Sequence, residues 1–179
     1  VDVGGGSSEF CVIGPTDPPR ASGLKLGSNR LTTKHAAGDP PTRVEVAAMT
    51  TDALAILEGA PHTTPAEVVA VGGTASNLLK VVPEARIDLV LTRARIAEAL
   101  EILANETAQE AVERHMVKPI RARLLPAGAA IMDALLTRYG VTRIRVSDAG
   151  IREAGYVAQA HRLAGSCPQA VAAYEFCHP

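Results

Sequence analysis

The stretch Asp2-Val3-Gly4-Gly5-Gly6-Ser7-Ser8-Glu9 lies at the start of the 179-residue chain. The segment Val1–Val3 before the glycines and the segment Glu9–Ile13 after them are each typical of a short strand, so the stretch predicts a β-hairpin. Three successive glycines permit a tight turn whose backbone amides converge on an anion. Carboxylates on either side of such a turn can hold Mg²⁺ directly or through water. We therefore predict phosphate ligands at Gly4, Gly5, Gly6 and Ser7, and metal ligands at Asp2 and Glu9.

The residues around these glycines exclude two other phosphate-binding motifs. A dinucleotide fingerprint needs a helix after its glycines, whereas an apolar strand pattern follows here. A P-loop needs Gly-Lys-Ser or Gly-Lys-Thr, which the sequence lacks. From these residues alone, a glycine-rich hairpin tip that binds no ligand remains an alternative.

A second glycine motif follows an apolar run in the middle of the chain. The run Glu67–Val71 predicts a buried strand, and a helix is expected to follow through Leu79. Free amides at a helix N-terminus attract anions, which favours a second phosphate loop. Its residues would be Gly72, Gly73 and Thr74. The alternative is a plain strand-to-helix turn with Thr74 as its cap.

The other segments predict an α/β fold. A third strand is expected over Ala21–Leu26, which would complete an antiparallel meander, and Asn29–Thr42 reads as a loop. Further helices are predicted over Val44–Leu57, over Arg93–Asn105 with Thr92 as N-cap, over Ala108–Met116, from Pro126 to Tyr139 and over Ile151–Leu163, with a strand over Thr142–Val146 and a turn over Ser147–Gly150. A meander followed by strands alternating with helices is the pattern of a ribonuclease-H-like domain with parallel strands and flanking helices.

Composition narrows the classes of function. The formal net charge is −1, which argues against general electrostatic binding to DNA or to an anionic membrane. Apolar runs are too short for a membrane span, and no signal-peptide pattern is present. Three cysteines are too few for a disulfide scaffold, so we expect a reduced, cytoplasmic environment.

Two other groups of residues are weaker candidates for a site. A zinc site is disfavoured at four residues near the C-terminus, because their spacing does not match known zinc motifs. These residues are His161, Cys167, Cys177 and His178. His115 reads as a solvated helix-face residue. A basic set can be either a track for a chain anion or a solvated face: Arg114, Lys118, Arg121 and Arg123.

Three motifs in order resemble a known family. The sequence D-V-G-G-G-S-S-E is similar to the family's D-I-G-G-G-S-T-E, G-G-T recurs at Gly72, and V-S-D-A-G-I-R-E-A-G is similar to V-S-D-x-G-L-R-E-G, with Ala154 inserted. Jointly these motifs resemble the exopolyphosphatase and guanosine pentaphosphate phosphatase (Ppx/GppA) family, over about Val1–Gly155. The resemblance implies the second actin-like domain over residues 1–163, with a C-terminal tail over 164–179.

The family removes a terminal phosphate with water and Mg²⁺, so the resemblance implies an exopolyphosphatase-type hydrolase. By position it assigns Arg121 to the distal phosphate chain or to a nucleotide. The family's first domain carries another phosphate loop and the Glu thought to activate water, and neither motif occurs here. We therefore expect the chain to bind polyanion and to hydrolyse nothing without that domain. A homodimer is expected by resemblance alone.

Three alternatives remain open at this point. Guanosine pentaphosphate, rather than inorganic polyphosphate, is one choice of substrate. A non-catalytic actin-like module that binds nucleotide or polyphosphate is another reading. A sugar or acetate kinase half of the same superfamily is disfavoured by the G-G-G-S-S-E and S-D-x-G-I-R-E pair.

Overall fold

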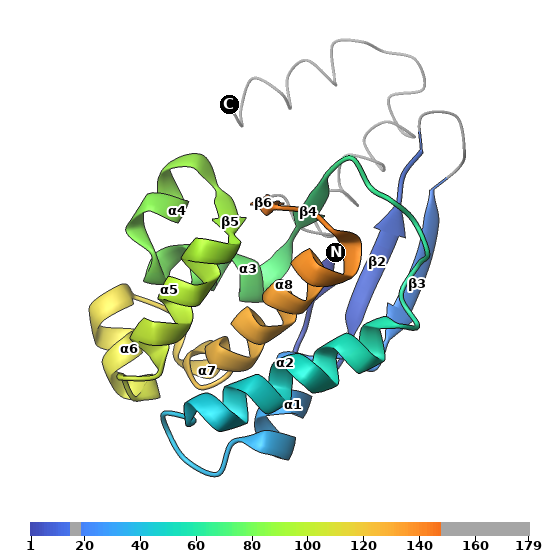
Figure 1. Ribbon diagram of the computed structural model, residues 1–179. Helices are drawn as coiled ribbons and strands as arrows, with labels where there is room; N and C mark the ends of the chain where they lie inside the picture. The colour runs from blue at the N-terminus through green and yellow to red at the C-terminus, as the bar shows by residue number, and fades with distance from the viewer. Residues whose placement is uncertain (15–18, 148–179) are drawn as a thin grey trace, which may run out of the picture. The chain divides into compact units, whose positions relative to one another are not determined.

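The computed structural model describes residues 1–14 and 19–147. Its first sheet is antiparallel and runs in the order β1 (Asp2–Val3), β2 (Ser8–Val12) and β3 (Arg20–Leu24) (Figure 1). The register places Asp2 opposite Glu9. The two carboxylates of the predicted metal site therefore lie on neighbouring strands at the same level of the sheet.

A second sheet is mixed and runs in the order β4 (Val68–Ala70), β6 (Arg143–Val146) and β5 (Val90–Thr92). Strands β4 and β6 are parallel, whereas β5 and β6 are antiparallel. A single parallel bridge joins Asp2 to Val71, whose backbone N–H donates to the Val1 carbonyl at 2.8 Å. The bridge brings β1 beside the end of β4, so Asp2 lies where the two sheets meet.

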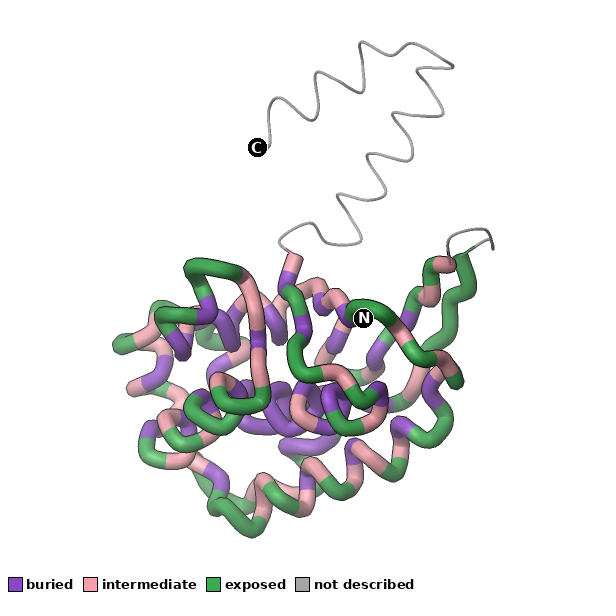
Figure 2. Tube along the Cα trace, turned by 45° about the horizontal axis from the view of Figure 1, so that its top comes forward, coloured by how far each residue is buried: buried purple, intermediate pink, exposed green. Residues whose placement is uncertain are grey.

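Helices pack against these strands, and α8 lies at the centre of the core. All but three residues of α8 are buried, and Figure 2 shows buried residues concentrated in the middle of the unit. Small side chains let α8 approach α2 and α3 closely, and α2 runs beside it in Figure 1. The helices are α1 (Ser28–His35), α2 (Arg43–Leu57), α3 (Gly72–Val81), α4 (Pro83–Asp88), α5 (Arg93–Leu103), α6 (Ala108–His115), α7 (Pro119–Ala122) and α8 (Leu125–Tyr139).

Threonine caps begin three of the helices. The Thr92 hydroxyl accepts from the Arg95 amide, as predicted for the start of α5. Helices α2 and α6 begin with reciprocal capping boxes, in which Thr42 and Thr107 pair with glutamates three residues later. These local signals explain why both helices begin where the sequence pattern predicts.

Several predictions differ from the structure. The predicted loop Asn29–Thr42 was wrong in its first part, because α1 occupies it up to His35. Strand β5 and helix α4 were not predicted, and β5 runs antiparallel to β6. Only Ser147 of the turn predicted over Ser147–Gly150 is among the described residues. The helix predicted over Ile151–Leu163 and the tail predicted over 164–179 lie outside the described residues. Within the described ranges, no helix combines the length and apolar character that a bilayer crossing needs.

Candidate functional site

The glycine turn is fixed by its carbonyl groups. The Gly4 carbonyl accepts from the Ser28 amide at 3.0 Å, and the Gly5 carbonyl accepts from the Asn29 amide at 2.9 Å. The Gly6 carbonyl accepts from Arg30 Nε at 2.8 Å. All three carbonyls therefore point toward the N-terminal turn of α1.

The amides of the same peptide units point the other way, because the C=O and N–H of a trans peptide are antiparallel. These amides belong to Gly5, Gly6 and Ser7. Within the part of the chain that the structure describes, none of the three makes a hydrogen bond. The turn thus presents three adjacent donors on the side away from α1, where an anion can accept hydrogen bonds from them.

Gly27 belongs to this turn although the sequence motifs did not single it out. A Cβ built on Gly27 would lie 2.3 Å from the Gly5 carbonyl oxygen, a backbone atom. A side chain is thus excluded at the point where α1 begins. The available signal in the sequence was that Gly27 directly follows the third predicted strand.

The second predicted loop begins α3 directly after β4. Gly72 has φ of 85°, and the N-cap residue Val71 provides no side-chain hydrogen bond. The first-turn amides of Gly72, Gly73 and Thr74 have no acceptor within the helix, so the α3 N-terminus can bind an anion. The alternative that Thr74 caps this helix is wrong, because Val71 is the N-cap.

The side chain of Thr74 has a structural contact. It is buried, and its hydroxyl donates to the Val3 carbonyl at 2.6 Å, which ties α3 to β1. A Cβ on Gly128 in α8 would lie 2.5 Å from Thr74 Cγ2. The hydroxyl of Thr74 is therefore engaged, and its backbone amide is the group that remains for a ligand.

Asp2 connects the two loops. A Cβ on Gly72 would lie 2.3 Å from Asp2 Oδ1, so this carboxylate packs against the first residue of α3. Burial raises the pKa of Asp2, and the neighbouring Glu9 carboxylate raises it further, while the charge of Arg121 acts in the opposite direction. Glu9 accepts a hydrogen bond from the Ser7 hydroxyl at 2.5 Å.

Arg121 reaches the same place from α7. Its Nε would lie 3.3 Å from a Cβ built on Gly73. Its guanidinium makes no hydrogen bond or ion pair with any residue in the described ranges. The structure thus places the half-buried Arg121 at the N-terminus of α3, near the carboxylate of Asp2. Its guanidinium is not engaged in a hydrogen bond or ion pair with the described residues.

The other basic candidates are arranged differently. Arg114 forms an ion pair with the buried Glu106 at 2.8 Å, and His115 contacts the same carboxylate at 2.9 Å. The prediction of a solvated His115 was wrong, because its side chain is only 16% exposed. Lys118 and Arg123 are exposed.

The donor set at Asp2 and Glu9 fits Mg²⁺. Two carboxylates in cross-strand register provide hard oxygen ligands, and Mg²⁺ is commonly held by one or two carboxylates together with substrate phosphate oxygens. No group of three or more acidic, histidine or cysteine side chains forms a closed metal cage among the described residues. The pair therefore suits an ion that shares its coordination with a bound phosphate.

Comparisons with known proteins identify the family of this chain. The model of the Ppx/GppA phosphatase family matches residues 1–163. Exopolyphosphatase 1 of Mycobacterium bovis and that of Mycobacterium tuberculosis are each 28% identical to this chain over 165 residues, which cover 86% of the chain and 48% of the relative. The chain thus spans about half the length of these curated relatives.

Solved structures show the same fold. The crystal structure of the Aquifex aeolicus Ppx/GppA family member superposes with a TM-score of 0.78 at 26% identity, over 88% of this chain and 54% of that one. An exopolyphosphatase from Cytophaga hutchinsonii matches in fold with a TM-score of 0.67 at 18% identity, over 82% of this chain and 51% of that one. With a family model that matches from the glycine turn to residue 163, the chain belongs to the Ppx/GppA phosphatase family.

Proposed function

We propose that residues 1–163 form the second actin-like domain of an exopolyphosphatase and provide one wall of its phosphate-binding cleft. One observation carries the proposal. The Asp2 carboxylate packs against Gly72 and lies in register with Glu9, so two sets of free amides meet at one acidic pair. In this proposal, the whole protein is a cytoplasmic enzyme that hydrolyses the terminal phosphate of inorganic polyphosphate.

The two loops bind phosphate oxygens in this proposal. The amides of Gly5, Gly6 and Ser7 donate from the turn, and those at the start of α3 donate from beside Asp2. Charge-assisted hydrogen bonds of this kind are about twice as strong as neutral ones. Because the turn is fixed by α1, its donors are preorganised and need little rearrangement when charge develops on the phosphoryl oxygens.

Asp2 and Glu9 hold Mg²⁺ in this proposal. The ion, when bound, neutralises charge on the phosphoryl oxygens during transfer. Because the pKa of Asp2 is raised, its proton competes with the ion over a wider range of acidic pH. We therefore expect Mg²⁺-dependent binding of polyanion to weaken as the pH falls toward the pKa of Asp2.

Arg121 binds a phosphate group beside Gly73, where its guanidinium has no protein partner among the described residues. The base that activates water is not assigned to this chain, because Asp2 and Glu9 position the metal. It belongs instead to the family's first domain. We therefore propose that the chain binds polyphosphate, and that turnover requires the family's first domain as well.

Calorimetric titration of the chain with tripolyphosphate, with and without Mg²⁺, tests the proposal. Arg121→Gln is expected to weaken binding about tenfold, because one hydrogen-bonded charge is lost. Arg123→Gln removes the same charge two residues away and should leave affinity nearly unchanged. A parallel titration with guanosine pentaphosphate compares the alternative substrate.

Two results would contradict the proposal. Equal losses in Arg121→Gln and Arg123→Gln would indicate a general charge effect without a site. Steady release of phosphate from polyphosphate by the chain alone would show that its own carboxylates suffice for catalysis.

A further inference from the structure

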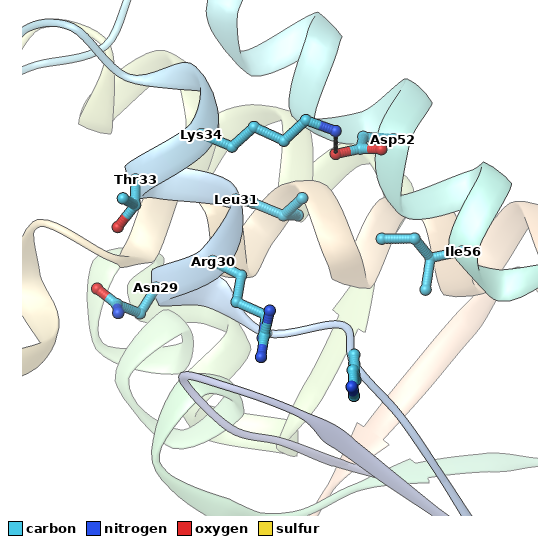
Figure 3. Close-up of a pocket in the computed structure, with 9 residues that line it drawn as sticks. Asn29, Arg30, Leu31, Thr33, Lys34, Asp52 and Ile56 are labelled. Carbon is cyan, nitrogen blue, oxygen red and sulfur yellow. Dashed lines mark hydrogen bonds and ion pairs between the residues drawn. The ribbon is translucent and has the colours of Figure 1, made fainter.

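A pocket of about 490 Å³ opens between α1 and α2, outside the two loops described above. Figure 3 shows Lys34 on α1 and Asp52 on α2 pointing toward one another across it. Leu31 and Ile56 give it apolar contacts. The complete lining is Lys25, Gly27, Asn29, Arg30, Leu31, Thr33, Lys34, Asp52 and Ile56.

The lining carries an excess of positive charge. It includes three cationic side chains, those of Lys25, Arg30 and Lys34, and a single carboxylate, that of Asp52. Lys25 is exposed and makes no hydrogen bond or ion pair within the described part of the chain. The pocket is therefore attractive to an anion even when Lys34 is paired.

Asp52 restrains the third cation. Its Oδ2 lies 2.7 Å from Lys34 Nζ and 3.0 Å from His35 Nε2. Hydrogen bonds from Lys34 and then from His35 hold the pKa of Asp52 below its ordinary value, so the carboxylate is charged at neutral pH. An anion that enters the pocket must compete with Asp52 for Lys34.

The pocket adjoins the glycine turn on the side where the carbonyls of the turn face α1. Gly27 lines the pocket, and a Cβ built on it would lie 2.3 Å from the Gly5 carbonyl oxygen. Arg30 also lines the pocket while its Nε donates to the Gly6 carbonyl at 2.8 Å. The two terminal nitrogens of Arg30 make no further hydrogen bond with described residues. The same side chain can therefore contact the Gly6 carbonyl through Nε and an anion in the pocket through its terminal nitrogens.

We propose that this pocket binds a further phosphate group of a polyphosphate chain, with Lys25 and Arg30 as its cationic contacts and Asp52 as a restraint on Lys34. This inference rests on the proposed function, because its ligand is the same polyanion that the two loops bind. The pocket suits phosphate better than a nucleoside, since no aromatic ring lines it for stacking on a base. A chain anion requires repeated cationic contacts, which Lys25 and Arg30 provide in this pocket.

The test is a binding measurement with three titrants: inorganic phosphate, tripolyphosphate and a long polyphosphate. Lys25→Gln should weaken long-chain binding about threefold to fivefold, the loss expected for one exposed charge pair. Inorganic phosphate, which fills the loops alone, should bind unchanged. Asp52→Asn should strengthen long-chain binding by a similar factor, because Lys34 is released.

Arg86→Gln is the matched control. Arg86 is exposed on α4, away from α1 in Figure 1, and makes no side-chain hydrogen bond within the described ranges. The Arg86→Gln variant removes one positive charge, so it measures the effect of net charge alone. Urea unfolding of each variant checks that the fold is retained.

The outcomes separate this inference from the proposed function. If Arg121→Gln loses binding while Lys25→Gln and Arg86→Gln have equal affinities for long polyphosphate, the pocket is not a phosphate site. The proposed function of the two loops would then still stand. A failure of tripolyphosphate to bind the unaltered chain would overturn both. Opposite shifts in Lys25→Gln and Asp52→Asn, confined to the longer titrants, would support the pocket.

Discussion

At the scale of single residues, Gly72 combines two constraints. Its φ of 85° is unfavourable for any side chain, and a Cβ would meet the Asp2 carboxylate. We expect Gly72→Ala to lower the free energy of unfolding by about 1–2 kcal/mol from the backbone alone. The displaced Asp2 adds a further loss and also weakens tripolyphosphate binding. Urea unfolding and calorimetric titration measure the two effects.

Gly140→Ala separates the backbone cost from the contact. Gly140 also has a positive φ, of 63°, but nothing lies within 4 Å of a Cβ built on it. The difference between the two variants is therefore the cost of disturbing Asp2. In an Asp2→Ala background that difference should disappear. Equal destabilisation of the two single variants would show that the Asp2 contact has no energetic weight.

At the scale of elements, α1 is stabilised by the glycine turn. Its N-cap, Gly27, offers no side chain, and the first amides of the helix donate to Gly4 and Gly5 instead. Gly27→Ala is expected to push the turn away and expose these amides. Hydrogen exchange in α1 should accelerate about tenfold, since overpacking against rigid atoms costs about 1–3 kcal/mol.

Gly6→Ala is the control in the same turn. Nothing lies within 4 Å of a Cβ at Gly6, and its φ is not positive. It should leave exchange in α1 unchanged. If both alanine variants accelerate exchange equally, the contact between Gly27 and Gly5 does not hold the helix.

How far the sequence predicts each element depends on where its partners lie. The helix after Thr92 was predictable because its cap is local, whereas α1 was not because its partners are more than twenty residues away. Strand β5 has only three residues, too few for a periodic pattern. The glycine loops were predictable as motifs, but the contact between Asp2 and Gly72 depends on tertiary packing. Arg121 was assigned through the family resemblance and not from its own surroundings in the sequence.

At the scale of the whole molecule, carboxylates link stability to pH. Hydrogen bonds from backbone amides and threonine hydroxyls lower the pKa values of Glu45 and Glu110 in the two capping boxes. A carboxylate whose pKa is lowered by folding stabilises the fold at any pH above its pKa in the unfolded state. That contribution is lost as the pH falls through its pKa in the folded state. The raised pKa of Asp2 acts oppositely, because its ionisation costs stability as the pH rises.

We predict that the double variant Glu45→Gln and Glu110→Gln flattens the acid side of this profile. Glutamine keeps an acceptor oxygen for each cap but carries no charge, so the variant should be less stable than the unaltered chain at pH 7. The two should converge only as the pH falls through the folded pKa values of Glu45 and Glu110, which lie below the ordinary carboxyl pKa of about 4. Urea midpoints measured across this range test the convergence. Glu98→Gln, at an exposed carboxylate with no hydrogen bond in the described ranges, should run parallel to the unaltered chain. A constant gap between the double variant and the unaltered chain at every pH would instead place the loss in packing or hydrogen bonding, and not in the charge of the caps.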